Sequence, residues 1–186
     1  DIFLVGSDNG LFRVTNRNSA IPLWSEGRVD QLLRLQNGWL MRTAKGIFFS
    51  QDLKNFEERD AGLPFLTIKT FKDGKTSLSL QIQELKDLSV NPINHNEIVT
   101  ATKDSVFYSR DAGVNWINLG SMSKTTPGVK AVAVATLEGQ TVVFMAHPIF
   151  GLSYIIPDKP KAEWCDVDAG FEKMPSLTSP DEIADI

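Results

Sequence analysis

The most informative segment of this chain is Ser109-Arg110-Asp111-Ala112-Gly113-Val114-Asn115-Trp116, which directly follows an aromatic strand at 106–108. Its composition is typical of a turn between two antiparallel strands. A short carboxylate such as that of Asp111 can accept the N–H groups that such a turn leaves pointing inward. Gly113 can adopt the positive φ that the loop needs. Ser109 adds a second local hydrogen bond, and Trp116 returns the chain to the core.

This pattern, S-x-D-x-G-x-x-W, resembles the Asp box, or BNR repeat, of β-propeller proteins such as sialidases, sortilin-type receptors and photosystem II assembly factors. A second box is one residue shorter, with Lys54 in place of the glycine. The resemblance implies a β-propeller in which the motif stabilises a turn and carries out no chemistry. The implied structural residues are Ser109, Asp111, Gly113 and Trp116 in the complete box, and Ser50, Asp52 and Phe56 in the shorter one.

Four similar units repeat along the chain, each with a strand, a tight turn, a second strand, a polar loop and a returning strand that an aromatic residue begins. Three of them are preceded by a further apolar strand, and four strands make one propeller blade. An Asp-Gly turn between alternating residues predicts an additional hairpin. We expect units at approximately 1–28, 29–66, 84–122 and 128–170, an inserted hairpin at 67–83, and a further blade or a ring-closing strand beginning at 171–186.

The predicted fold is therefore all-β, with a single β-propeller domain of about four four-stranded blades over 1–186. The first unit lacks its opening strand, and two interpretations follow. Either 171–186 supplies that strand and closes a small ring, or the chain is part of a larger propeller. The resemblance favours the larger ring. Open blade edges could then pair with another chain and form a homo-oligomer.

Composition restricts the partners. The 186 residues carry a net charge of −4, which argues against nucleic acid as a partner. The longest apolar stretches have the length of strands, so no membrane span is expected.

The single cysteine, Cys165, excludes an intramolecular disulfide, and we expect it to be packed and unreactive. The two isolated histidines do not form a metal set, and we expect no metal or cofactor. The resemblance implies an extracytoplasmic location, periplasmic or secreted.

Catalytic groups are not evident. A sialidase needs three arginines, an R-I-P motif and a Tyr/Glu nucleophile pair, whereas Ile21-Pro22 is here preceded by Ala20. Both tyrosines, Tyr108 and Tyr154, lie in equivalent strands and are expected in the core. Paired carboxylates that match a glycosidase by residue type alone are Glu57-Glu58 and Asp181-Glu182. We expect these pairs to be solvated turn charges, and we expect no enzyme activity.

The sequence therefore predicts a non-catalytic binding or scaffolding module that mediates protein–protein interaction. The alternative is a carbohydrate-binding accessory domain, or a fragment of a sialidase-like glycoside hydrolase whose catalytic residues are absent here. A ligand should meet the loops opposite the box loops, where mixed charge and a phenyl ring suit a protein contact. The candidate binding residues are Asp8, Arg28, Arg42, Lys45, Lys103, Asp104, His147 and Phe150.

Overall fold

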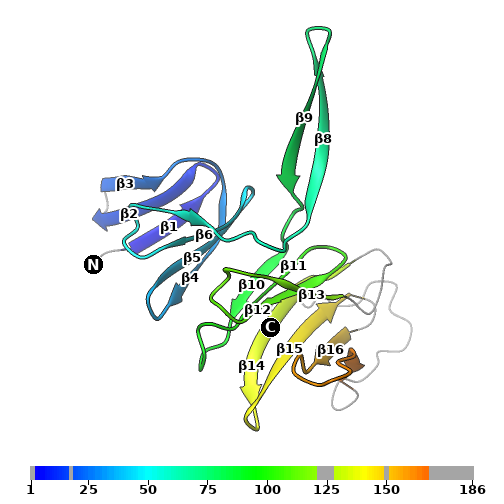
Figure 1. Ribbon diagram of the computed structural model, residues 1–186. Coiled ribbons are helices and arrows are strands. Elements are labelled where there is room, and N and C mark those ends of the chain that lie inside the picture. The colour runs from blue at the N-terminus through cyan, green and yellow to red at the C-terminus, as the bar shows by residue number, and fades with distance from the viewer. Residues whose placement is uncertain (1–2, 17–18, 121–127, 149–150, 168–186) are drawn as a thin grey trace. The chain divides into compact units, whose positions relative to one another are not determined.

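The computed structural model describes residues 3–16, 19–120, 128–148 and 151–167, and these residues form an all-β structure of small antiparallel sheets (Figure 1). The chain divides into two compact units, Asp1–Glu84 (unit 1) and Leu85–Ile186 (unit 2). No helix in the described ranges is long and apolar enough to cross a membrane.

Unit 1 contains two sheets and a hairpin. The first sheet has the order β1-β2-β3, without the opening strand that the other sheets possess, and the second has the order β4-β5-β6-β7. Their strands are β1 (Phe3–Ser7), β2 (Gly10–Asn16), β3 (Ser19–Trp24), β4 (Val29–Leu35), β5 (Gly38–Thr43), β6 (Gly46–Ser50) and β7 (Glu57–Glu58). Trp24 and Phe48 meet between the two sheets with ring centroids 5.7 Å apart. All of β6 is buried, as its short apolar run predicts.

The third element of unit 1 is a two-stranded hairpin, β8 (Phe65–Lys72) and β9 (Lys75–Ile82), which is labelled in Figure 1. Its strands pair antiparallel from Phe65 opposite Ile82 to Lys72 opposite Lys75. The connecting residues, Asp73 and Gly74, have φ values of 53° and 75°. Positive φ at both positions is the geometry of a type I′ turn, which the Asp-Gly pair in the sequence predicts.

Unit 2 contains two four-stranded antiparallel sheets of sequential strands. The first sheet comprises β10 (Asp87–Val90), β11 (Ile98–Ala101), β12 (Val106–Ser109) and β13 (Ile117–Gly120). The second comprises β14 (Ala131–Leu137), β15 (Gln140–His147), β16 (Gly151–Ile155) and β17 (Cys165–Asp166). The middle strands β11 and β12 of the first sheet are wholly buried, and β15 of the second is mostly buried, whereas the last strand of each sheet is more exposed.

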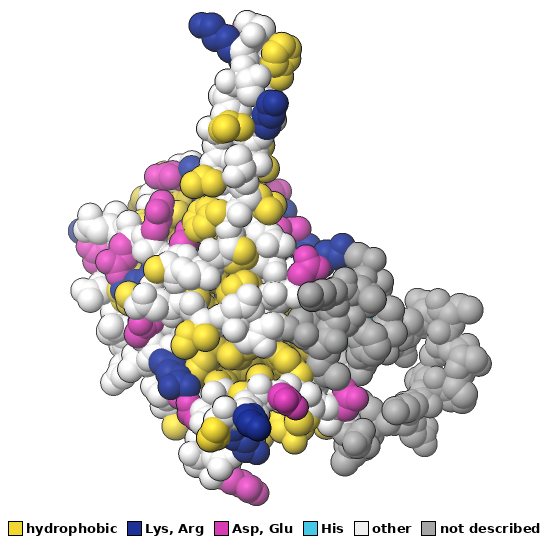
Figure 2. Space-filling view, turned by 45° about the vertical axis from the view of Figure 1, so that its right-hand side comes forward, with side chains coloured by type: hydrophobic (Ala, Val, Ile, Leu, Met, Phe, Trp, Pro, Cys, Tyr) yellow, Lys and Arg dark blue, Asp and Glu magenta, His cyan; other side chains and the backbone are white. Residues whose placement is uncertain are grey.

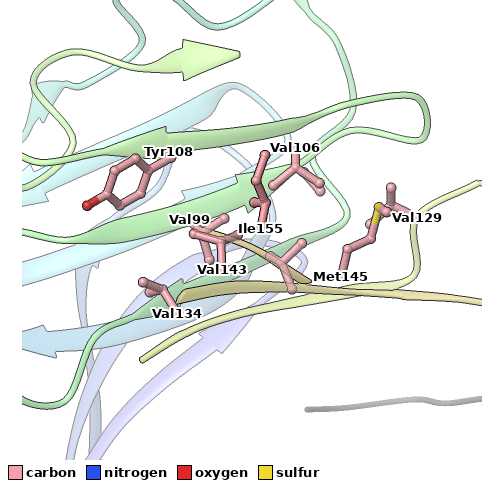
Figure 3. Packing of buried hydrophobic residues seen from close by; sticks show 10 residues of the cluster. Val99, Val106, Tyr108, Val129, Val134, Val143, Met145 and Ile155 are labelled. Atoms are coloured by element: carbon pink, nitrogen blue, oxygen red, sulfur yellow. The ribbon is translucent and has the colours of Figure 1, made fainter. Parts of the chain in front are cut away.

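A hydrophobic core joins the two sheets of unit 2 (Figure 3). Val99 and Tyr108 of the first sheet pack with Val143 and Met145 of the second, and all four side chains are buried. Burial, together with the negative charge of Glu97, raises the pKa of the Tyr108 hydroxyl to about 12. Burial of this kind removes apolar surface from water on both sides of the contact, which holds the sheets face to face.

Two carboxylates also link these sheets. The N–H of Val132 in β14 donates to Oδ2 of Asp87 at 2.9 Å. Thr141 Oγ1 donates to Oε1 of Glu97 at 2.8 Å. Each carboxylate therefore satisfies a polar group of the neighbouring sheet at the edge of the core, where an unpaired donor would destabilise the packing.

The turn between β12 and β13 has the hydrogen bonds that its sequence predicts. Asp111 Oδ1 accepts the N–H of Asn115 at 2.8 Å, and Ser109 Oγ accepts the N–H of Gly113 at 2.9 Å. Gly113 has a φ of 86°, and the preceding Ala112 has a φ of 57°. Trp116 is buried. The sequence did not indicate the role of Asn115, whose side-chain Nδ2 donates to Asp111 Oδ2 at 2.8 Å.

The shorter turn after β6 reproduces this arrangement with one residue fewer. Asp52 Oδ1 accepts the N–H groups of Lys54 and Asn55 at 2.8 and 2.9 Å. The place of the glycine belongs to Leu53, since Leu53 has a φ of 59° and its N–H donates to Ser50 Oγ at 2.8 Å. The alignment that puts Lys54 there is therefore wrong. Backbone hydrogen bonds lower the pKa of Asp52 to about 2.

The complete box allows a direct test of its hydrogen bonds. Replacing Asp111 or Asn115 by alanine should each lower the free energy of unfolding by about 1 kcal/mol. Because the two side chains bond each other, the double variant should lose less than the sum of the two losses, as measured by urea denaturation. Strictly additive losses would show that the Asp111–Asn115 contact contributes nothing to the turn.

Candidate binding surfaces

Three of the turns predicted to face a ligand share one hydrogen-bond pattern. In each, a hydroxyl at the end of a strand accepts the N–H two residues later and donates to the carbonyl three residues later. The N–H of Asn9 donates to Ser7 Oγ at 3.2 Å. In the same way, the N–H of Lys45 donates to Thr43 Oγ1 at 3.0 Å, and the N–H of Asp104 donates to Thr102 Oγ1 at 3.3 Å. These turns are thus held by their own side chains, which leaves Asp8, Lys45, Lys103 and Asp104 exposed.

Ion pairs connect several of the predicted residues in unit 1. Arg28 Nε lies 2.7 Å from Asp30 Oδ1, and Arg42 Nη1 lies 3.7 Å from Oδ2 of the same carboxylate. Lys45 Nζ lies 3.0 Å from Glu26 Oε2. The structure therefore brings Arg28 and Arg42 together around Asp30, and each cation already has an acidic neighbour. Such pairs near the surface stabilise a protein only slightly.

His147 was predicted to lie in an exposed turn, and this prediction is wrong. It is the last residue of β15, pairs with Gly151 and is buried, so it does not belong to an exposed turn. The reason is that the apolar strand continues one residue further than expected, which places His147 where Ser7 and Thr43 stand in the other sheets. Phe150 lies outside the described residues.

Asp60 is a titratable group that the sequence did not single out. Its Oδ1 accepts the N–H of Ile47 at 2.9 Å, beside the turn that carries Lys45. A Cβ built on Gly46 would lie 2.4 Å from Oδ2, so the carboxylate needs the space that a glycine leaves. Burial raises the pKa of Asp60 to about 6, even though the Ile47 hydrogen bond lowers it. No local sequence signal predicts this contact, because it joins residues thirteen positions apart.

Where the structure describes them, the carboxylates that match a glycosidase by residue type do not face one another. Glu57 and Glu58 are successive residues of β7, so their side chains point to opposite faces of the strand. Asp181-Glu182 lies outside the described residues. Cys165 is exposed, and the expectation of a packed cysteine is wrong, because β17 is the outermost strand of its sheet. Within the described ranges no three His, Cys, Asp or Glu side chains are grouped so that they could hold a metal.

The most exposed apolar surface lies on the β8–β9 hairpin, to which the sequence analysis assigned no function. Every residue of β8 and every residue of β9 except Ile82 is exposed. Figure 2 shows apolar side chains along this hairpin, at the top of the view. The exposed fractions are 47% for Phe65, 74% for Phe71, 69% for Leu78 and 73% for Leu80.

Strand pairing separates the hairpin into two faces. Residues directly opposite each other in an antiparallel pair share a face, and successive residues alternate. One face, called here the apolar face, carries Phe65, Thr67, Lys69, Phe71, Thr76, Leu78, Leu80 and Ile82. The opposite face, called the polar face, carries Leu66, Ile68, Thr70, Lys72, Lys75, Ser77, Ser79 and Gln81. The three most exposed apolar side chains of the hairpin, Phe71, Leu78 and Leu80, thus lie on the apolar face, whereas Leu66 and Ile68 on the polar face are 49% and 37% exposed.

Solved structures that are similar to this chain include an enzyme and a WD40 domain. An ancestral GH74 enzyme is similar with a TM-score of 0.52 and 16% identity, over 82% of this chain and 21% of the enzyme chain. The WD40 domain of Pan2 from Neurospora crassa is similar with a TM-score of 0.51 and 10% identity, over 89% of this chain and 46% of that one. No protein-family model and no curated protein sequence matches the chain.

These similarities support a β-propeller fold, and at such low identity they show the fold alone. The chain spans less than half the length of either structure. Membership in the Asp-box family, the number of blades, the boundaries between the units and the closure of a ring stay predictions.

The raised pKa of Asp60 predicts an unusual dependence of stability on pH. In the unfolded chain the Asp60 carboxyl loses its proton near its ordinary pKa of 3.8, whereas in the folded protein it keeps the proton up to about pH 6. Between these pH values the folded state binds more protons than the unfolded state, so the free energy of unfolding should fall as the pH rises. Asp60→Asn keeps an oxygen acceptor for Ile47 and removes the charge. The variant should therefore be more stable than the wild type above pH 6, and the difference should vanish toward pH 4.

Urea denaturation of both proteins across this interval measures the effect. Glu58→Gln is the matched control, since it removes an exposed neighbouring charge and should change the pH profile much less. A stability difference between Asp60→Asn and wild type that stays constant across the interval would show that the Asp60 carboxyl does not titrate as described.

Proposed function

We propose that the chain is a non-catalytic module that binds another protein, and that the β8–β9 hairpin is its docking element. The observation that carries this proposal is the exposed apolar face of the hairpin, with Phe65, Phe71, Leu78 and Leu80 on one side. Contiguous exposed apolar patches on soluble proteins mark interaction sites or aggregation hazards. A fold that retains such a patch on a regular hairpin is best explained by a partner that covers it.

The chemistry of this face favours a protein partner over a carbohydrate. Its large side chains are phenyl and aliphatic groups, and its other members are two threonines and Lys69. Small-ligand sites are concave and fix their ligand with a few converging polar groups, whereas a two-stranded hairpin whose residues are exposed encloses no ligand. The similarity to the ancestral GH74 enzyme concerns the fold alone and does not indicate a substrate for this chain.

The arrangement of the carboxylates supports the non-catalytic part of the proposal. A glycosidase needs two carboxyl groups that face one another across the bond to be cleaved. Here Glu57 and Glu58 point to opposite faces, and Asp60 is committed to the N–H of Ile47. The predicted turn residues Asp8, Lys45, Lys103 and Asp104 stay candidates for additional partner contacts, because their side chains are exposed.

A photo-crosslinking amino acid tests whether the apolar face touches a protein. It is introduced at Leu80 on the apolar face, or at the adjacent Ser79 on the polar face as a matched control, in the cells that produce the protein. Illumination should give a covalent protein adduct from position 80 and little from position 79. Absence of an adduct from position 80, or equal adducts from both positions, would contradict the proposal.

A further inference from the structure

Three two-residue turns in this chain carry an asparagine or aspartate that precedes a glycine. They are the turns of Asn9-Gly10, Asn37-Gly38 and Asp73-Gly74. In such a pair the backbone nitrogen of the glycine can attack the side-chain carbonyl carbon of the preceding residue, because glycine has no side chain that obstructs the approach. The attack needs a glycine nitrogen that is free of hydrogen bonds and has room to move, and the three turns differ in this respect.

Hydrogen bonding occupies the glycine nitrogen in the two asparagine turns. Gly10 and Gly38 each flank their turn, and the residues that flank a two-residue turn form a hydrogen-bonded pair. Both glycines are buried. A Cβ built on Gly10 would lie 2.0 Å from the carbonyl oxygen of Trp24, and a Cβ built on Gly38 would lie 2.6 Å from the ring of Phe49. Neither nitrogen can approach its asparagine side chain unless the turn opens.

The aspartate turn leaves its glycine nitrogen free. Asp73 and Gly74 form the loop itself, between the last paired residues of β8 and β9, so the N–H of Gly74 takes no part in the ladder of the hairpin. Both residues are exposed, and a Cβ built on Gly74 would meet nothing within 4 Å. The nitrogen of Gly74 can therefore reach the side chain of Asp73 without breaking a hydrogen bond of the hairpin.

The reaction that follows is a rearrangement of the backbone. The nitrogen of Gly74 forms a bond to Cγ of Asp73, the carboxyl loses its hydroxyl and the nitrogen its proton, and these leave together as water. The product is a five-membered succinimide ring, and water then adds to one of its two carbonyl carbons. Opening at Cγ restores the original peptide bond. Opening at the backbone carbonyl leaves the chain running through Cγ, as an isoaspartyl bond of unchanged mass.

We propose that Asp73 is a site of spontaneous covalent modification, at which the bond to Gly74 rearranges to an isoaspartyl bond and disrupts the tip of the hairpin. The rearranged backbone contains one more methylene group between the two strands. It cannot keep the φ values of 53° and 75° that form the turn, so the pairing of Lys72 with Lys75 is lost. A sheet of only two strands is marginally stable and tolerates such a loss poorly.

The turn between β14 and β15 provides a matched control within the same chain. Glu138 and Gly139 form its loop, with φ values of 51° and 76°, and both are exposed. A Cβ built on Gly139 would also meet nothing within 4 Å. The backbone geometry and the access are thus those of the aspartate turn. Glutamate, however, has one more methylene group and would have to close a six-membered ring, which forms much more slowly than a five-membered one.

Mass spectrometry of the full chain tests the modification. The folded protein is kept for several weeks at physiological temperature and digested, and electron-transfer fragmentation then distinguishes isoaspartyl from aspartyl bonds of equal mass. The wild type should accumulate the isoaspartyl form at Asp73 and show no rearrangement at Glu138. Asp73→Glu should abolish the modification, and Glu138→Asp should create a second site in the other turn.

A second measurement tests the effect on the hairpin. In the rearranged protein, separated by chromatography, the amides of Thr70 and Ser77 beside the turn should exchange their hydrogens about tenfold faster than in the unmodified protein. Unchanged exchange would overturn the disruption of the tip. An Asp73 that rearranges in the urea-denatured chain but not in the folded protein would overturn the modification itself. Neither readout depends on a partner, so this inference and the proposed function fail separately.

Discussion

Burial of both faces of each small sheet is the constraint on which the rest of this structure depends. A sheet of four short strands cannot cover its own faces, so stability has to come from packing against a neighbouring sheet. In unit 2 this packing places Val99 and Val143 in one core, and the carboxylates of Asp87 and Glu97 serve polar groups of the adjacent sheet. The β8–β9 hairpin is the part of the described chain in which this constraint is least satisfied, and that contrast is the reason for proposing it as a binding surface.

The ends of the strands use side chains in different ways. At one end, Asp52 and Asp111 collect hydrogen bonds from the following loop, and these bonds lower the pKa of both carboxyls. At the other end, the hydroxyls of Ser7, Thr43 and Thr102 close tight turns. Asp60 shows the opposite electrostatic behaviour, because burial outweighs its single backbone hydrogen bond. Identical carboxyl groups thus differ in pKa according to how deeply they are buried and how many hydrogen bonds they accept.

Local chemistry made much of this fold predictable from the sequence. The Asp-Gly pair at 73–74 predicts the type I′ turn, and the spacing of Ser109, Asp111 and Gly113 predicts the turn after β12. Other features depend on information that spacing does not contain. The place of Leu53 in the shorter box required its φ and its bond to Ser50, since a deletion can be aligned in two ways.

Long-range contacts account for the remaining differences. The buried position of His147 depends on where β15 ends, and the raised pKa of Asp60 depends on the burial of its carboxyl beside Gly46, which is distant in the sequence. The alternation of Leu78 and Leu80 with serines was visible in the sequence. Alternation indicates that a strand has two unlike faces, but it does not reveal whether the apolar one is covered.

Amide hydrogen exchange by NMR tests most directly the claim that the hairpin is formed and uncovered. The amides that donate across the hairpin, which alternate along each strand from the pair Lys72–Lys75 that flanks the turn, should exchange slowly, and the amides that point outward should exchange fast. The inward set is Leu66, Ile68, Thr70, Ser77, Ser79 and Gln81, and the outward set is Thr67, Lys69, Phe71, Thr76, Leu78 and Leu80. Alternating protection would establish a free hairpin. Uniformly fast exchange would mean that the hairpin is not formed, and uniformly slow exchange would mean that its edges are already covered; either result would contradict this account.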